Sequence, residues 1–118
     1  MAMTIHKNFF SDRNEALDDI KKSGFWPSTL VAGPSTGLEV HWHTEDVHAY
    51  IVEGDTWFLD GETGVRHTVA TGDKIVIPTG TLHAEGEILD QVIYYIGLSK
   101  AVDSEEFLKL RPPEDRAG

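Results

Sequence analysis

The chain contains no cysteine among its 118 residues, which excludes disulfide bonds and thiolate ligands to a metal. A transition-metal site would therefore have to be built from His, Asp, Glu or Gln side chains. No apolar run approaches the roughly 20 residues that a membrane span requires. The first 25 residues carry charges throughout and lack the apolar segment of a secretory signal. Together with the lack of cysteine, these absences lead us to expect a cytoplasmic protein.

Basic residues are also scarce. The 10 Lys and Arg residues stand against 20 Asp and Glu residues, which gives a formal net charge of −10. Nucleic acids and anionic membrane surfaces are bound through clusters of Lys and Arg, which this sequence does not offer. The composition therefore argues against both and favours a small-molecule or protein partner.

The length fits a single domain, which the sequence divides into three parts. We expect an N-terminal arm and helix over residues 1–27, a barrel over residues 28–100, and a short C-terminal helix and tail over residues 101–118. Residues 112–118 hold prolines and charges but no large apolar side chain, and this composition predicts disorder.

A helix is predicted over residues 12–23. Asp12 and Glu15 have the spacing of a capping box, and Gly24 can end the helix. The apolar stripe of this helix consists of Ala16, Leu17 and Ile20.

The arm before this helix, residues 1–10, has the character of an edge strand. Its apolar residues Phe9 and Phe10 could complete the sheet of a second copy by strand addition. We therefore expect a homodimer.

Between residues 25 and 98, short β-rich runs alternate with turn residues, a pattern typical of an all-β sandwich or barrel. The predicted strands cover residues 29–32, 38–43, 47–52, 57–59, 66–69, 74–77, 82–85 and 92–97. A second short helix is predicted over residues 103–110.

Four histidines form the most informative pattern in the sequence. His41 and His43 are two residues apart in a predicted strand, so their side chains lie on the same face and can reach one ion. His83 follows a Pro-x-Gly turn and could return to that face from a neighbouring strand. His48 lies between these two groups. A small β-barrel of this kind can enclose one small ligand.

The segments around these histidines carry two motifs. The stretch from Gly37 to Gly54 resembles the first cupin motif, G-x5-H-x-H-x3-4-E-x6-G, and the stretch from Gly72 to His83 resembles the second, G-x5-P-x-G-x2-H-x3-N. This resemblance covers about residues 36–98. It implies a cupin double-stranded β-helix, which is a jelly-roll barrel. It also implies one divalent metal ion inside the barrel, bound by two histidines and a glutamate of the first motif and the histidine of the second.

The glutamate of the first motif is missing. Counting back from the motif glycine leads to Val47, which cannot bind a metal, and counting on from His43 leads to His48, which can. The two counts differ by one residue, so a β-bulge is needed to turn His48 inward. We expect His48 to be the fourth ligand, beside His41, His43 and His83, with Glu45 and Asp46 as the alternatives.

Three further side chains are candidates for the wall of the pocket. Glu39 shares the metal-facing side if the strand of the paired histidines is regular. The adjacent aromatic residues at 57–58 and 94–95 must each place one member inward, and we take Trp57 and Tyr95 as those members.

Imidazole ligands suit Fe(II), Ni(II), Mn(II), Zn(II) and Cu(II), and the spacing does not choose among these ions. The first hypothesis is a metalloenzyme acting on a small polar organic molecule, for which the resemblance to cupins implies a dioxygenase, isomerase or lyase activity. The alternative is a non-catalytic cupin that binds or senses a small ligand. An inward-facing carboxylate able to act as a general base would separate the two.

Overall fold

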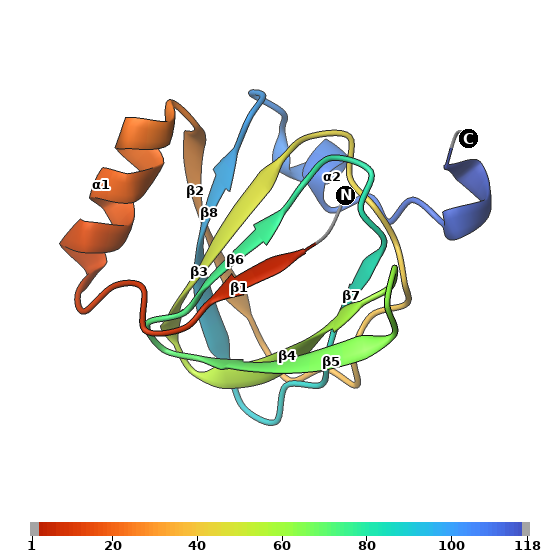
Figure 1. Ribbon diagram of the computed structural model, residues 1–118, viewed down its shortest axis with the longest axis horizontal. Coiled ribbons are helices and arrows are strands. Elements are labelled where there is room, and N and C mark those ends of the chain that lie inside the picture. The colour runs from red at the N-terminus through yellow and green to blue at the C-terminus, as the bar shows by residue number, and fades with distance from the viewer. Residues whose placement is uncertain (1–2, 117–118) are drawn as a thin grey trace.

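The computed structural model describes residues 3–116 and contains two antiparallel β-sheets that face each other (Figure 1). The strand order is β1-β6-β3-β8-β2 in the five-stranded sheet and β5-β4-β7 in the three-stranded sheet. The strands are β1 (Thr4–His6), β2 (Trp26–Ala32), β3 (Val47–Glu53), β4 (Asp55–Asp60), β5 (Val65–Ala70), β6 (Lys74–Ile77), β7 (His83–Glu85) and β8 (Val92–Leu98). The helical segments are α1 (Arg13–Ser23), α2 (Ser104–Phe107) and a 3-10 turn, η1 (Pro113–Asp115). The predicted all-β barrel with a short helix near each end is confirmed.

The central strand β3 shows how the sequence divides the two sides of the larger sheet. Val47, Ala49 and Ile51 are buried in the core between the sheets. Tyr50 belongs instead to a second apolar cluster with Ala16 and other residues of α1. Because side chains alternate along a strand, β3 lines the barrel with one face and supports α1 with the other. Figure 1 shows α1 on the outside of this sheet.

Helix α1 forms as its capping residues predict. The Asp12 side chain accepts a hydrogen bond from the Glu15 backbone N–H at 2.9 Å, and Glu15 Oε1 accepts one from the Ser11 N–H at 2.7 Å. Gly24 ends the helix in the left-handed conformation with φ 72°. Of the predicted apolar stripe, Ala16 and Ile20 are buried, whereas Leu17 is exposed.

Three predicted segments differ from the structure. The helix expected over residues 103–110 is shorter, because α2 ends at Phe107. The strand expected over residues 38–43 is wrong in its extent, because this part of the chain makes isolated bridges, such as His41 with His83 and Trp42 with Arg111, rather than a continuous ladder. The disorder expected over residues 112–118 is wrong as far as residue 116, and the last two residues lie outside the described part.

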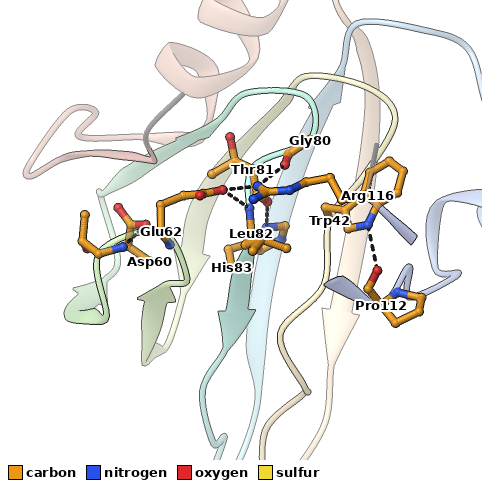
Figure 2. A network of polar contacts seen from close by, with 10 residues as sticks. Trp42, Asp60, Glu62, Gly80, Thr81, Leu82, His83, Pro112 and Arg116 are labelled. Carbon is orange, nitrogen blue, oxygen red and sulfur yellow. Dashed lines mark hydrogen bonds and ion pairs between the residues drawn. The ribbon is translucent and has the colours of Figure 1, made fainter. Parts of the chain in front are cut away.

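The C-terminal tail is held by long-range contacts that its composition does not reveal (Figure 2). Trp42 Nε1 donates a hydrogen bond to the Pro112 carbonyl at 3.0 Å. The Arg116 guanidinium pairs with Glu62 and also donates to the Gly80 carbonyl at 3.1 Å. These contacts fix the tail against the rim of the barrel.

The N-terminal arm is used within its own chain. Strand β1 pairs with β6, where Ile5 lies opposite Ile75. Phe10 is buried against Tyr50, with ring centroids 6.1 Å apart, while Phe9 is 40% exposed. The arm therefore completes the sheet of its own barrel, and the homodimer stays a prediction. In the part of the chain that the structure describes, no helix has the length and apolar character to cross a membrane.

Asp73 attaches the arm to the turn before β6. Its side chain is 2% exposed and accepts hydrogen bonds from the Asn8 N–H at 2.9 Å, the Ala70 N–H at 2.9 Å and the Lys7 ammonium at 2.5 Å. Burial acts to raise the pKa of Asp73, but the Lys7 ammonium and the two backbone N–H groups outweigh it and leave this pKa lowered.

Replacing Asp73 by asparagine should therefore destabilise the protein by about 1–3 kcal/mol at neutral pH, since the buried donors lose a charged acceptor. A group with a lowered pKa stabilises the fold above its unfolded pKa of about 3.9 and loses that contribution as the pH falls through its folded pKa. The difference between wild type and Asp73→Asn should thus narrow below about pH 4. Urea unfolding at several pH values measures it, with the exposed Asp90→Asn as the matched control. A difference that is absent at neutral pH, or constant down to pH 2, would contradict this role.

Candidate metal centre

The two motif segments meet through a pair of backbone hydrogen bonds. The His41 N–H donates to the His83 carbonyl at 2.9 Å, and the His83 N–H donates to the His41 carbonyl at 3.0 Å. This is the pattern of directly opposed residues in an antiparallel pair. Glu85 lies two residues beyond His83 on β7, so its side chain is on the same face. The pairing thereby brings residues from distant parts of the sequence to one position inside the barrel.

Four side chains converge there: His41, His43, His83 and Glu85. One possible ligand atom from each lies within 4.8 Å of the corresponding atoms of the others. The distances are 3.2 Å from His41 Nε2 to Glu85 Oε2 and 3.6 Å from His83 Nε2 to Glu85 Oε1. All three histidines are buried, at 1%, 8% and 0% exposure in chain order. These donors and spacings are typical of a metal site.

Backbone carbonyls fix the orientation of two of the rings. His41 Nδ1 lies 2.6 Å from the Glu39 carbonyl, and His83 Nδ1 lies 2.9 Å from the Thr81 carbonyl. A carbonyl can only accept, so in the neutral ring Nδ1 carries the proton and Nε2 keeps its lone pair. Metal-binding histidines commonly hold their second ring nitrogen in this way. Both Nε2 atoms are therefore prepared as ligands.

The same atoms lack hydrogen-bond partners among residues 3–116. His41 Nε2, His83 Nε2 and Glu85 Oε2 are buried, and none of them makes a hydrogen bond of acceptable geometry even though they approach one another. Buried polar atoms of this kind cost free energy unless something satisfies them. A divalent cation placed among them would satisfy all three. The residues therefore fit a metal ion.

The charges of the cluster also suit a cation. Burial acts to raise the pKa of Glu85, but the neighbouring His41 and His83 rings hold it well below its usual range. Burial, together with the His83 and His41 rings, lowers the pKa of His43 to about 4. Burial lowers the pKa of His41 as well, but the Glu85 carboxylate outweighs this effect and leaves that pKa raised. An ionised carboxylate and a neutral His43 ring are the forms in which these groups bind metals.

The structure does not place His48, the expected fourth ligand, in this cluster. Its ring stacks on Phe25 with centroids 4.3 Å apart, on the side of the sheet that faces α1. Val47 lines the barrel cavity in its place. The physical reason is the position of the β3 irregularity, because the register shift lies between Ile51 and Glu53, beyond His48. Strand alternation from Val47 therefore directs His48 outward.

Glu45 and Asp46, the alternatives to His48 as the fourth ligand, are not part of the cluster. Glu45 is buried but accepts a hydrogen bond from the Thr44 hydroxyl at 2.5 Å. Asp46 accepts one from the Thr79 N–H at 2.8 Å and so supports the turn after β6. The carboxylate that the structure supplies is Glu85, which the sequence analysis missed. A usable signal was present, because a His-x-Glu pair in a strand places both side chains on one face.

The three side chains predicted to form the pocket wall do not line the cavity. The Glu39 side chain is exposed, and this residue contributes only its backbone carbonyl to the site. At each aromatic pair the other member points inward, so Phe58 and Tyr94 line the cavity in place of Trp57 and Tyr95. Trp57 packs under the Arg66 guanidinium, which lies 3.9 Å from its ring centroid. Tyr95 packs against the cluster beneath α1.

The four-residue cluster lies in a cavity of about 320 Å³ between the sheets. The C-terminal segment covers part of it, because Phe107, Leu108 and Leu110 are among the lining residues. The Phe107 ring stacks on His43, with centroids 5.1 Å apart and an angle of 22° between the planes. The tail contacts of Trp42 and Arg116 in Figure 2 hold this cover in place.

Comparisons with known proteins assign this geometry to a fold. No family model matches the chain, and no curated protein matches it. Among solved structures, a DUF861 family protein from Thermotoga maritima is similar with 18% identity and a TM-score of 0.58, over 81% of this chain and 98% of that chain. An RmlC-like cupin from Shewanella frigidimarina is similar with 18% identity and a TM-score of 0.57, over 69% of this chain and 70% of that chain. The DMSP lyase DddQ from Ruegeria pomeroyi is similar with 18% identity and a TM-score of 0.55, over 68% of this chain and 43% of that chain.

The chain therefore has the cupin fold, as its two motifs predicted. Within that fold it carries a buried cluster of three histidines and one glutamate that could hold a metal ion.

The ligand set is tested by comparing His83→Gln with His48→Gln. We expect His83→Gln to weaken zinc binding by at least about tenfold, because a buried ligand is lost from a fixed site. His48→Gln should bind zinc as the wild type does, since its ring faces α1. Competition with a chromophoric chelator measures both affinities, and circular dichroism checks that each variant is folded. Zinc binding that is weakened by His48→Gln and unchanged by His83→Gln would restore the rejected assignment.

Proposed function

We propose that this protein is a metalloenzyme of the cupin fold that uses one divalent transition-metal ion to bind and activate a small organic molecule in its barrel. The observation that carries this proposal is the convergence of His41, His43, His83 and Glu85, three of which present buried ligand atoms without hydrogen-bond partners in the described part of the chain. A structural role alone would favour hydrogen-bonded or apolar side chains at this position.

The donor set narrows the choice of ion. Three imidazole nitrogens and one carboxylate suit Fe(II), Mn(II), Ni(II), Zn(II) or Cu(II), whereas Ca²⁺ and Mg²⁺ prefer oxygen ligands throughout. An ion of this type would polarise a bound oxygen atom as a Lewis acid or, for a redox-active metal, react with O2. Four protein ligands leave room for such a molecule wherever the ion accepts five or six ligands.

The surrounding residues define what the protein itself contributes. The three histidines of the cluster are buried, and burial strengthens the electrostatic interactions that they make. Tyr94 lines the same cavity, and burial together with the Glu85 charge raises the pKa of its phenol. Tyr94 therefore keeps its proton at neutral pH and can donate a hydrogen bond to a bound molecule.

A second candidate function, a non-catalytic ligand-binding protein, is favoured by one observation. Among the residues that line the cavity in the described chain, Glu85 is the single carboxylate, and it belongs to the ligand cluster. A separate carboxylate to act as general base is therefore not found beside the site. The enzyme proposal consequently relies on Lewis-acid or O2 chemistry, and the similarity in fold to a DMSP lyase is compatible with it.

An open coordination position separates a reactive or ligand-binding centre from a closed structural one. We expect the Co(II)-loaded protein to show visible absorption bands that shift in a saturable way when azide is added. His83→Gln, which loses a ligand, is the matched control and should retain little cobalt. Metal analysis of each sample gives the stoichiometry. A protein that takes up no divalent ion would refute the proposed function, and bound cobalt that does not respond to azide would indicate a closed structural site.

A further inference from the structure

The cavity around the cluster is apolar over nearly all of its wall. Its lining comes from both sheets and includes Ala32, Val47, Phe58 and Ile96, together with Phe107 of the C-terminal segment. Apart from the four-residue cluster, Ser35 and Tyr94 supply the polar side chains of this wall. A molecule inside this cavity would therefore meet polar groups mainly at the cluster.

The cavity wall also carries no Lys or Arg among the residues that the structure describes. A divalent ion bound by three neutral imidazoles and one carboxylate leaves a net charge of +1 at the cluster. One negative charge on a bound molecule would balance this charge. A second negative charge would have no cationic partner in the wall, and an unpaired buried charge is strongly unfavourable.

The size of the cavity limits the occupant further. Its volume of about 320 Å³ equals the liquid volume of roughly ten water molecules. This space suits a molecule with a short hydrocarbon chain or one ring. The partial cover by Phe107, Leu108 and Leu110 places more apolar surface at the entrance.

We propose that the cavity takes a small monoanionic molecule with an apolar body, such as a short-chain or medium-chain carboxylate, whose acid group lies at the histidine–glutamate cluster. This inference rests on the proposed metal site and names the class of molecule that this site takes. It replaces the small polar molecule expected from the sequence. Sugar phosphates and dicarboxylates are excluded by the same reasoning, because their additional polar groups would be buried against hydrocarbon.

A homologous series of carboxylates tests this proposal on the zinc-loaded protein by isothermal titration calorimetry. Affinity should rise about fourfold for each methylene group from acetate through butanoate to hexanoate, because each added group is buried against the wall. Adipate has the same number of carbons as hexanoate and a second carboxylate. It should bind at least about tenfold more weakly than hexanoate, since its second charge is unpaired.

A matched pair of variants on β2 locates the binding in this cavity. Ala32 lines the cavity, whereas the neighbouring Val31 is 57% exposed on the outer face. Ala32→Leu should remove the gain in affinity from acetate to hexanoate, because the larger side chain occupies the space that the hydrocarbon chain would take. Val31→Leu should behave as the wild type. Thermal unfolding shows whether each variant is folded.

A measurement on the metal-free protein tests the apolar character of the cavity independently of metal binding. Hexan-1-ol, which has no acid group, should shift amide signals of cavity residues in NMR spectra of wild type and Val31→Leu but not of Ala32→Leu. Failure to take up zinc, with hexan-1-ol still bound in the cavity, would refute the proposed function and leave the apolar character of the site standing. Bound zinc with affinities that do not change along the carboxylate series, or with adipate bound more tightly than hexanoate, would overturn this inference and leave the metal site intact. Absence of hexan-1-ol shifts in the wild type would also overturn it.

Discussion

The reciprocal backbone hydrogen bonds between His41 and His83 are the constraint on which the site depends. They join the segment that carries His41 and His43 to the strand that carries His83 and Glu85, and so bring all four donors together. Because side chains alternate along a strand, a slip of one residue in this pairing would turn His83 and Glu85 away from the other two. A further bond from the Gly80 N–H to the His43 carbonyl, at 2.9 Å, holds the first segment in place. The donors are thus positioned by the backbone.

This arrangement carries a cost in stability that a purely structural core would avoid. The cluster contains buried polar atoms that have no hydrogen-bond partner within residues 3–116, and it lies beside a cavity of about 320 Å³ that side chains do not fill. Both features oppose folding, since unsatisfied polar atoms and unfilled volume each lower the free energy of unfolding. Proteins keep such features where function requires them. Elsewhere in the barrel, the hydrogen bond of Trp42 to the tail and the hydrogen bonds of Asp73 to the arm stabilise the fold.

Features that depend on neighbouring residues in the sequence could be predicted from the sequence. The helix α1 follows from its cap and apolar stripe, and the meeting of His41, His43 and His83 follows from their spacing and the alternation of strand side chains. His48 was assigned wrongly because long-range pairing with β8 places the irregularity of β3 after it, which the sequence does not show. The same limit applies to the aromatic pairs, where alternation indicates that one member points inward but not which one. Glu85 could have been predicted, since it lies two residues beyond His83 in a strand.

Anomalous diffraction from crystals of the zinc-loaded protein, measured above the zinc absorption edge, tests whether these four side chains bind one metal ion. We expect one strong anomalous peak per chain, in contact with Nε2 of His41, Nε2 of His83, a ring nitrogen of His43 and a carboxylate oxygen of Glu85. Stoichiometric zinc whose peak lies beside His48, or elsewhere outside this cluster, would contradict this expectation.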